Sequence, residues 1–225
     1  MFLSASTAVG AALVLPACKR SGDGPDDVTA TEDLMREHGV LRRALIVYRA
    51  VAARLRVNAG SVPPDVLLRT ATLFRLFGEE YHERRLEEDH IFPIVKKRAG
   101  NASAAIDTLI VQHARGREIT TYILTAAQGP KIGANATALA DVFDSFARMY
   151  ERHAAIEDTL IFPAWKKALS PHQIDEMGEQ FEQIEKDVMG KDGFEYGVDQ
   201  IGSIETALGL SDLALFTAPP PPTSA

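Results

Sequence analysis

The sequence is poor in cysteine and in clustered positive charge. Cys18 is the single cysteine among 225 residues, so the chain can form neither a disulfide framework nor a thiolate cage for a metal ion. Its lysines and arginines are scattered and the formal net charge is −7, which argues against the basic face of a nucleic-acid-binding protein. Phosphate-binding loops and nucleophile elbows are also missing from the sequence. A transition-metal site in this chain must therefore use histidine, aspartate and glutamate.

The first 30 residues differ in composition from the rest. Residues 1–17 are apolar and rich in small side chains, but the run is too short to predict a membrane span. Leu15-Pro16-Ala17-Cys18 resembles the cleavage box of bacterial lipoproteins, in which the cysteine becomes lipidated. We predict that residues 1–30 are an export signal and linker, with a lipid anchor at Cys18 and a periplasmic or membrane-anchored location. The alternative is a cytoplasmic protein with a flexible tail.

The rest of the sequence shows helical patterns and no strand patterns. Apolar side chains recur with helical spacing in four long segments, which predict helices over residues 31–57, 64–98, 102–127 and 136–168. Ser170-Pro171 has the N-cap and first-turn chemistry of a fifth helix that runs to Met189. Short connections force neighbouring helices antiparallel, so we predict an all-α, up-down-up-down four-helix bundle over residues 31–190. Residues 191–225 are predicted to be an extended tail with a short helix over 201–208.

An internal repeat links the second and fourth predicted helices. Residues 87–97 (EEDHIFPIVKK) and 157–167 (EDTLIFPAWKK) align without gaps at an offset of 70. The repeat indicates that one helix pair has been duplicated. Because proline removes a helical hydrogen bond, we expect a kink at Pro93 and at Pro163.

Ionisable side chains fall on the predicted inner faces of the bundle. His38, His113, His153 and Glu157 share their helical faces with the apolar seams of three different helices. A lone inward histidine is usually a hydrogen-bonded core residue, but three of them with a carboxylate one turn away favour a ligand set. Burying these groups is costly unless a divalent metal compensates them. A bundle without metal, in which they form a polar network, is the alternative.

The sequence does not determine which side chains of the second predicted helix are ligands. Regular helix geometry places Glu83 and Glu87 on the inner face and turns His82 away from Glu83 by about 100°. A π-bulge would let His82 and Glu87, five residues apart, face the same way. All three are therefore candidate ligands. His90 is expected in the core or beside the ligands, and His172 is expected at the surface.

These motifs together resemble the hemerythrin-like HHE cation-binding family. The resemblance covers about residues 31–190 and rests on His38, Tyr81-His82-Glu83, His113, the His153/Glu157 pair and the two Ile-Phe-Pro motifs. It implies two non-haem irons near one end of the bundle, bridged by carboxylates; manganese or zinc are alternatives by donor chemistry. It also implies binding or sensing of oxygen, or of iron, or handling of nitric oxide or peroxide.

Carried over by position, the resemblance assigns a role to each candidate. It implies terminal ligands at His38, His82, His113 and His153, and bridging carboxylates at Glu87 and Glu157. The third helix departs from the oxygen carriers, because the position of a second histidine holds Arg117. Either Glu83 fills this vacancy as a ligand, or Arg117 pairs with Glu83 and one metal keeps an open position.

Three functions follow from this pattern. The first is a di-iron protein that binds or senses oxygen or a related small ligand, or iron. The second is a di-iron oxidase or peroxidase. The third is a ferritin-like iron oxidase, since Glu79-x-x-His82 and Glu87-x-x-His90 match one piece of that pattern, but positions 150 and 110 are Tyr and Ile and its second pair fails.

Overall fold

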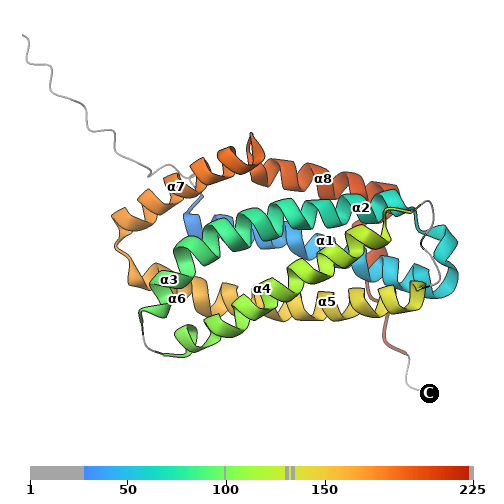
Figure 1. Ribbon diagram of the computed structural model, residues 1–225, viewed down its shortest axis with the longest axis horizontal. Coiled ribbons are helices and arrows are strands. Elements are labelled where there is room, and N and C mark those ends of the chain that lie inside the picture. Colours follow the sequence, from blue (N-terminus) through green and yellow to red (C-terminus); the bar gives the residue numbers. More distant parts are fainter. Residues whose placement is uncertain (1–27, 99, 130–131, 133–134, 223–225) are drawn as a thin grey trace, which may run out of the picture.

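The fold is an antiparallel bundle of four long helical rods. The computed structural model describes residues 28–98, 100–129, 132 and 135–222, and within these ranges all regular structure is helical (Figure 1). The predicted export signal and Cys18 lie outside the described residues. No helix in the described part is long and apolar enough to cross a membrane. The all-α, up-down-up-down fold predicted from the sequence is confirmed.

Two of the four rods are continuous α-helices and two contain π-helical segments. The first rod is α1 (Ala30–Asn58), followed by a short 3-10 turn, η1 (Ala59–Ser61), and the third rod is α4 (Asn101–Ala126). The second rod consists of α2 (Pro64–Leu73), the π-helical η2 (Phe74–Ile91) and α3 (Phe92–Lys96). The fourth consists of α5 (Ala136–Ile156), the π-helical η3 (Glu157–Ile161) and α6 (Phe162–Ala168).

Two further helices cover one side of the bundle. Helix α7 (Pro171–Met189) begins with the predicted Ser170 cap, in a reciprocal capping box with Gln173, and ends at Gly190 with φ of 71°. Helix α8 (Gly193–Leu208) follows, and a 3-10 turn, η4 (Leu213–Phe216), lies in the exposed C-terminal segment. Figure 1 shows α7 and α8 running along α1 and the second rod.

Helix α8 is longer than the sequence predicts. The prediction was a short helix over residues 201–208, whereas the helix starts at Gly193. Its buried face begins with Gly193 and Gly197 before Ile201, Ile204 and Leu208. A Cβ at Gly197 would lie 3.1 Å from Phe77 and 3.2 Å from Val40, so the glycine allows close packing on the bundle. Hydrophobic periodicity does not reveal the first half of this buried face of α8, because glycine carries no hydrophobic side chain.

The bundle core divides into an aromatic part and a polar part. Tyr48 stacks on Phe143 with ring centroids 4.9 Å apart, and Phe74 and Phe146 complete this cluster. Tyr150 contacts the same cluster, but its hydroxyl group reaches a buried glutamate. The aromatic cluster therefore seals one side of the region in which the ionisable side chains are buried.

Buried acidic groups lie where α7 and α8 pack on α1. Glu185 is 6% exposed, and its carboxylate accepts the backbone N–H of Phe194 at 2.8 Å. Burial, aided by the charges of Glu37 and Asp33 and opposed by that hydrogen bond, raises the pKa of Glu185 to about 7. Burial also raises the pKa of Asp33 to about 6.

The raised pKa of Glu185 predicts that Glu185→Gln stabilises the protein increasingly as the pH rises above 4.5, with the full gain above pH 7. The folded-state pKa of about 7 exceeds the ordinary value of 4.5, so ionisation of Glu185 costs stability progressively as pH rises from 4.5 to 7. We expect a gain on the order of 1–3 kcal/mol at pH 8 and none at pH 4, measured by urea unfolding. The exposed Glu182→Gln is the matched control on α7, and an equal gain from Glu185→Gln at both pH values would contradict the prediction.

Candidate metal centre

Four buried histidines, one from each rod, meet in the polar part of the core. His38 comes from α1, His82 from η2, His113 from α4 and His153 from α5, and none is more than 3% exposed. The Nε2 atoms form two pairs: His38 with His82, and His113 with His153, each 3.0 Å apart. The four histidines proposed from the sequence are thus brought together.

A π-helical segment resolves the open question about the second rod. The backbone N–H of Phe92 donates to the carbonyl oxygen of Glu87, five residues earlier, which is the π-helical spacing. In this geometry His82 and Glu87 face the same way, and His82 Nε2 lies 3.5 Å from Glu87 Oε1. The alternative that the sequence allowed through a π-bulge is therefore the one adopted.

The fourth rod repeats this arrangement at Glu157. The N–H of Phe162 donates to the carbonyl oxygen of Glu157, again five residues earlier. Pro93 and Pro163 directly follow the two phenylalanines, in the first turns of α3 and α6. Because proline has no N–H to donate, the α-helical bonding pattern is interrupted at the same place in both repeats. The sequence predicts a kink at each proline, and the structure has a π-helical segment directly before the helix that contains each one.

The two glutamates each span both histidine pairs. One oxygen of Glu87 lies 3.5 Å from His82 Nε2 and the other lies 3.3 Å from His113 Nε2. Glu157 places one oxygen 3.0 Å from His153 Nε2 and the other 3.5 Å from His38 Nε2. Both side chains are fully buried, and none of their four oxygens has a hydrogen-bond partner within the described residues.

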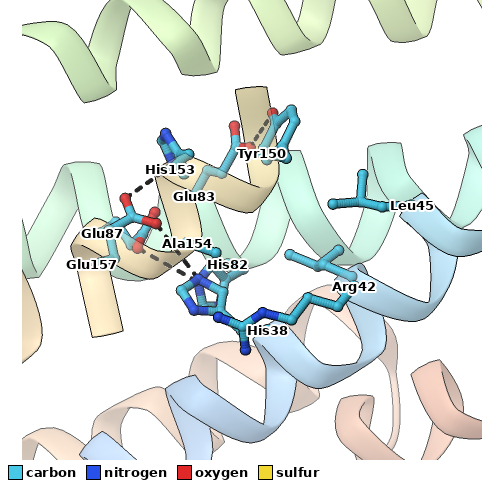
Figure 2. Close-up of a pocket in the computed structure, with 11 residues that line it drawn as sticks. His38, Arg42, Leu45, His82, Glu83, Glu87, Tyr150, His153, Ala154 and Glu157 are labelled. Carbon is cyan, nitrogen blue, oxygen red and sulfur yellow. Dashed lines mark hydrogen bonds and ion pairs between the residues drawn. The ribbon is translucent and has the colours of Figure 1, made fainter. Parts of the chain in front are cut away.

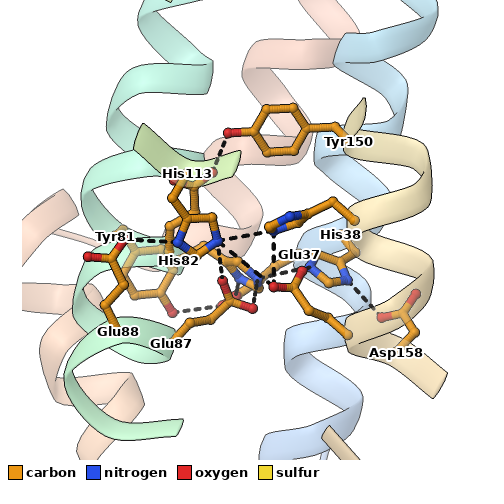
Figure 3. A network of polar contacts seen from close by, with 12 residues as sticks. Glu37, His38, Tyr81, His82, Glu87, Glu88, His113, Tyr150 and Asp158 are labelled. Carbon is orange, nitrogen blue, oxygen red and sulfur yellow. Dashed lines mark hydrogen bonds and ion pairs between the residues drawn. The ribbon is translucent and has the colours of Figure 1, made fainter. Parts of the chain in front are cut away.

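Each of the four histidines of the centre is oriented by an acceptor on a different rod. Three of the Nδ1 atoms contact carboxylate oxygens (Figure 3): His82 to Glu37 of α1, His113 to Glu88 of η2 at 2.8 Å, and His38 to Asp158 of η3 at 2.7 Å. The Nδ1 atom of His153 contacts the amide oxygen of Gln112 of α4 at 2.9 Å, which completes a ring of contacts around the bundle. In the neutral, metal-binding form of each imidazole, these acceptors assign the proton to Nδ1 and leave the Nε2 lone pair facing the centre.

This tautomer explains why the centre suits cations. Two Nε2 lone pairs that face each other at 3.0 Å repel unless a cation or a proton lies between them. The buried carboxylate oxygens of Glu87 and Glu157 also lack hydrogen-bond donors, so removing them from water costs free energy that a cation would recover. The donor set of imidazole nitrogens and carboxylate oxygens without thiolate fits a metal cofactor.

The protein groups of the cluster shift one another's ionisation strongly. Burial and the charge of Glu87 raise the pKa of Glu157 well above its ordinary value. Burial opposes the ionisation of Glu87, but the charges of protonated His82 and His113 outweigh it and hold its pKa well below the ordinary range. Burial opposes protonation of His82 and His113, but the nearby carboxylates outweigh it and raise the pKa of both well above the ordinary value. Without a metal, protons on these side chains therefore take the place that an added cation would fill.

Glu83 lies beside the centre and is tied to other partners. Its carboxylate accepts the Tyr150 hydroxyl at 2.5 Å and contacts the Arg117 guanidinium at 3.4 Å. Arg117 also donates to Glu88 at 2.5 Å. Glu83, Glu88 and His113 form a third group of clustered donor atoms, but the guanidinium contacts both of its carboxylates. Of the two arrangements that the sequence left open, the structure has the pairing of Arg117 with Glu83.

A small cavity adjoins the two histidine pairs. Its volume is about 10 Å³, which is close to the minimum that accommodates one water molecule. Leu41 lines the cavity with an apolar side chain. Leu45 and Ala154 supply further apolar walls, and Tyr150 and Glu83 supply polar ones (Figure 2). Burial, followed by the charge of Glu83, raises the pKa of Tyr150 well above its ordinary value, so its hydroxyl keeps the proton.

The orienting acceptors are the functional residues that the sequence reasoning missed. Each one directly adjoins a candidate ligand in the chain, in the pairs Glu37-His38, Glu87-Glu88, Gln112-His113 and Glu157-Asp158. The acidic neighbour at positions 88 and 158 recurs in the repeat and could have been noticed. His90 lies outside the centre and is half-buried against Phe181 of α7. The prediction that His90 lies in the core or beside the ligands is therefore wrong. His172 is exposed, as predicted.

The Tyr150 hydroxyl fits because α4 has a glycine opposite it. A Cβ at Gly116 would lie 2.0 Å from the Tyr150 oxygen and 2.9 Å from its Cζ. Gly116→Ala should therefore destabilise the protein by about 1–3 kcal/mol through overpacking, in spite of alanine's higher helix propensity. Urea unfolding at neutral pH measures this change.

Gly39→Ala is the matched control. Gly39 is also helical, and a Cβ there would meet nothing within 4 Å. We expect this variant to be unchanged or more stable by up to about 1 kcal/mol. Equal effects of the two alanine substitutions would contradict the tight fit of Tyr150 against α4.

Comparisons with known proteins agree with this site. Residues 29–165 match the hemerythrin HHE cation-binding domain. Uncharacterized proteins of Mycobacterium bovis and Mycobacterium tuberculosis are each 39% identical over 230 residues, covering 96% of this chain and 89% of theirs. No solved structure matches the chain significantly. The family match spans more than half of the chain, including all four histidines and both spanning glutamates, and the protein therefore belongs to the hemerythrin HHE cation-binding family.

Proposed function

We propose that the chain is a non-haem di-iron protein that binds or senses oxygen or a related small ligand. The observation that carries this proposal is the division of the histidine donors into two pairs that share the same two glutamates. Each pair of Nε2 atoms faces one oxygen of Glu87 and one oxygen of Glu157. This arrangement supports two cations that share two bridging carboxylates, rather than one.

The donor chemistry favours iron. His113 and His153 cluster with oxygens of Glu87 and Glu157, and His38 and His82 cluster with an oxygen of Glu87. The second oxygen of Glu157 lies 3.5 Å from His38 Nε2. Donor sets of this kind without thiolate suit iron or manganese, with zinc as a further candidate. Iron prefers more than four ligands, which leaves room for a small exogenous one. When bound, the metal pair supplies redox chemistry and the ligand-binding positions.

The remaining residues position the donors and restrict access. The Nδ1 contacts fix the four imidazole rings, and Tyr81 donates a further hydrogen bond of 2.7 Å to Glu37, which holds His82. The adjoining cavity admits a ligand of very few atoms, which supports oxygen, nitric oxide or peroxide over an organic substrate.

An oxidase or peroxidase is the second candidate. The observation in its favour is the polar pair of Tyr150 and Glu83 at the cavity, which a simple carrier site does not require. Anaerobic reduction followed by aeration distinguishes the two functions. A reversible absorption band supports ligand binding, and irreversible oxidation with turnover of a co-substrate supports catalysis.

The first prediction of this proposal concerns metal content. Purified protein from iron-replete cells should contain about two iron ions per chain by elemental analysis. Glu87→Gln should lower this to one or fewer, because the amide cannot bridge two cations as a carboxylate does. His90→Ala, which changes a histidine outside the centre, should retain two. Fewer than about one transition metal per wild-type chain would exclude the proposal.

The second prediction concerns the orienting acceptors. Asp158→Asn should lower metal affinity by about 10–100-fold, because it weakens the contact that orients His38 and supports its basicity. Competition with a chromophoric chelator measures this affinity. The exposed Asp89→Asn is the matched control and should bind metal as the wild type does. Equal affinities in all three proteins would show that Asp158 has no such role.

A further inference from the structure

We propose that Arg42 is the gate through which a small ligand reaches the metal centre. Its guanidinium closes the mouth of the cavity while it is paired with Asp158, and the mouth opens when this ion pair breaks. The inference rests on the proposed metal pair. It adds to that function the entry route of the ligand and the residue that controls the rate of entry.

The cavity reaches the surface of the bundle at Arg42. Of the 11 residues that line it, all except Arg42 are buried, with at most 6% of each residue exposed (Figure 2). Arg42 differs because 40% of its side chain is accessible. A path from solvent into the cavity has to pass between lining side chains, and it therefore passes beside Arg42.

Helix α1 places Arg42 on the same face as a metal ligand. Arg42 follows His38 by one helical turn, and Leu41 and Leu45 belong to the same face. All four residues line the cavity. Helical side chains lean toward the N-terminus of their helix, so the Arg42 side chain extends back over the turn that carries His38. Its stem therefore lies at the cavity while its charged head remains in contact with solvent.

An ion pair with the fourth rod holds the guanidinium at this place. Nη2 of Arg42 donates to Oδ2 of Asp158, which belongs to η3. The other oxygen of Asp158 lies 2.7 Å from Nδ1 of His38. Asp158 is thus held from two sides, and its side chain is 16% exposed. The pair connects the first and fourth rods directly beside the cavity, which closes its mouth.

This closure opens without movement of the helices. An ion pair with one well-exposed partner competes with water, so its net contribution is small and it breaks often. Exposed side chains change rotamer within nanoseconds. When Arg42 moves away, Asp158 keeps its contact with His38. Opening therefore changes access to the centre and leaves the orientation of the metal ligand in place.

A gate and a binding group have different effects on rates. A gate in rapid equilibrium slows entry and exit by the same factor, so its removal speeds both and leaves Kd unchanged. A cationic group that attracts an anion does the opposite, because its removal slows association and weakens binding. Azide is an anion and therefore distinguishes the two roles of an arginine.

Arg42→Ala tests the gate in the iron-loaded diferric protein with azide as the ligand. We expect the association and dissociation rate constants to rise together by about fivefold, because the ion pair no longer keeps the mouth closed. Stopped-flow absorption measures both rates. Equilibrium titration of the same absorption band should give a Kd within about twofold of the wild-type value.

Arg49→Ala is the matched control. Arg49 of α1 also pairs with the fourth rod, where its guanidinium lies 2.8 Å from Glu151 of α5, but it does not line the cavity. Both azide rate constants of this variant should stay within about twofold of the wild type.

Nitric oxide provides a second measurement, on the diferrous wild-type protein. Added salt weakens an ion pair with an exposed partner but does not change the encounter of an uncharged ligand with the protein. We expect the association rate constant of nitric oxide to rise about twofold to threefold between low salt and about 1 M salt. The same increase should be missing in Arg42→Ala.

The outcomes separate the gate from the proposed metal pair. If the wild type loads no metal, the di-iron function fails and the gate fails with it. If the wild type loads two irons, the gate alone is overturned when Arg42→Ala leaves both azide rates unchanged, slows association, or changes Kd as strongly as the rates. If Arg42→Ala does not retain its iron, a salt-independent nitric oxide rate in the wild type overturns the gate. Equal increases of both azide rates, with Arg49→Ala unchanged, support it.

Discussion

The fold depends on the burial of eight donor atoms that face one another in the core. Four Nε2 lone pairs and four carboxylate oxygens converge there without hydrogen-bond donors, in a region sealed by aromatic side chains. Such groups are costly to desolvate, and bound metal cations are the simplest compensation. Metal binding and folding stability are therefore expected to be linked, since a cation that binds the folded chain preferentially stabilises it.

The ring of Nδ1 contacts connects this centre to the whole bundle. Each rod contributes one histidine to the centre and an acceptor for the histidine of a neighbouring rod. Moving any rod would disturb two histidines at once, so the bundle geometry and the donor geometry are mutually dependent. Three of the four acceptors are carboxylates, and the fourth, Gln112, is a neutral amide. An amide supports imidazole basicity less than a carboxylate does. The two halves of the centre are thus chemically unequal, although their Nε2 separations are the same.

Much of this arrangement is predictable from the sequence, and the remainder has physical reasons for being hidden. Helical periodicity predicts the four rods, and the inward positions of His38, His113 and His153 follow from it. His82 does not, because a regular helix turns it away; the π-helical segment that turns it inward requires the backbone register, of which Pro93 is only a weak indication. Helix α8 begins with glycines, which carry no hydrophobic pattern. The Tyr150–Glu83 contact depends on the tertiary approach of α4 at Gly116, which no local pattern encodes.

The central claim is that two metal ions lie side by side between Glu87 and Glu157. Anomalous diffraction from crystals of the iron-loaded protein, recorded on both sides of the iron absorption edge, tests it most directly. The account predicts two anomalous peaks per chain, one next to the Nε2 atoms of His38 and His82 and one next to those of His113 and His153. A single peak, or peaks elsewhere in the molecule, would contradict it.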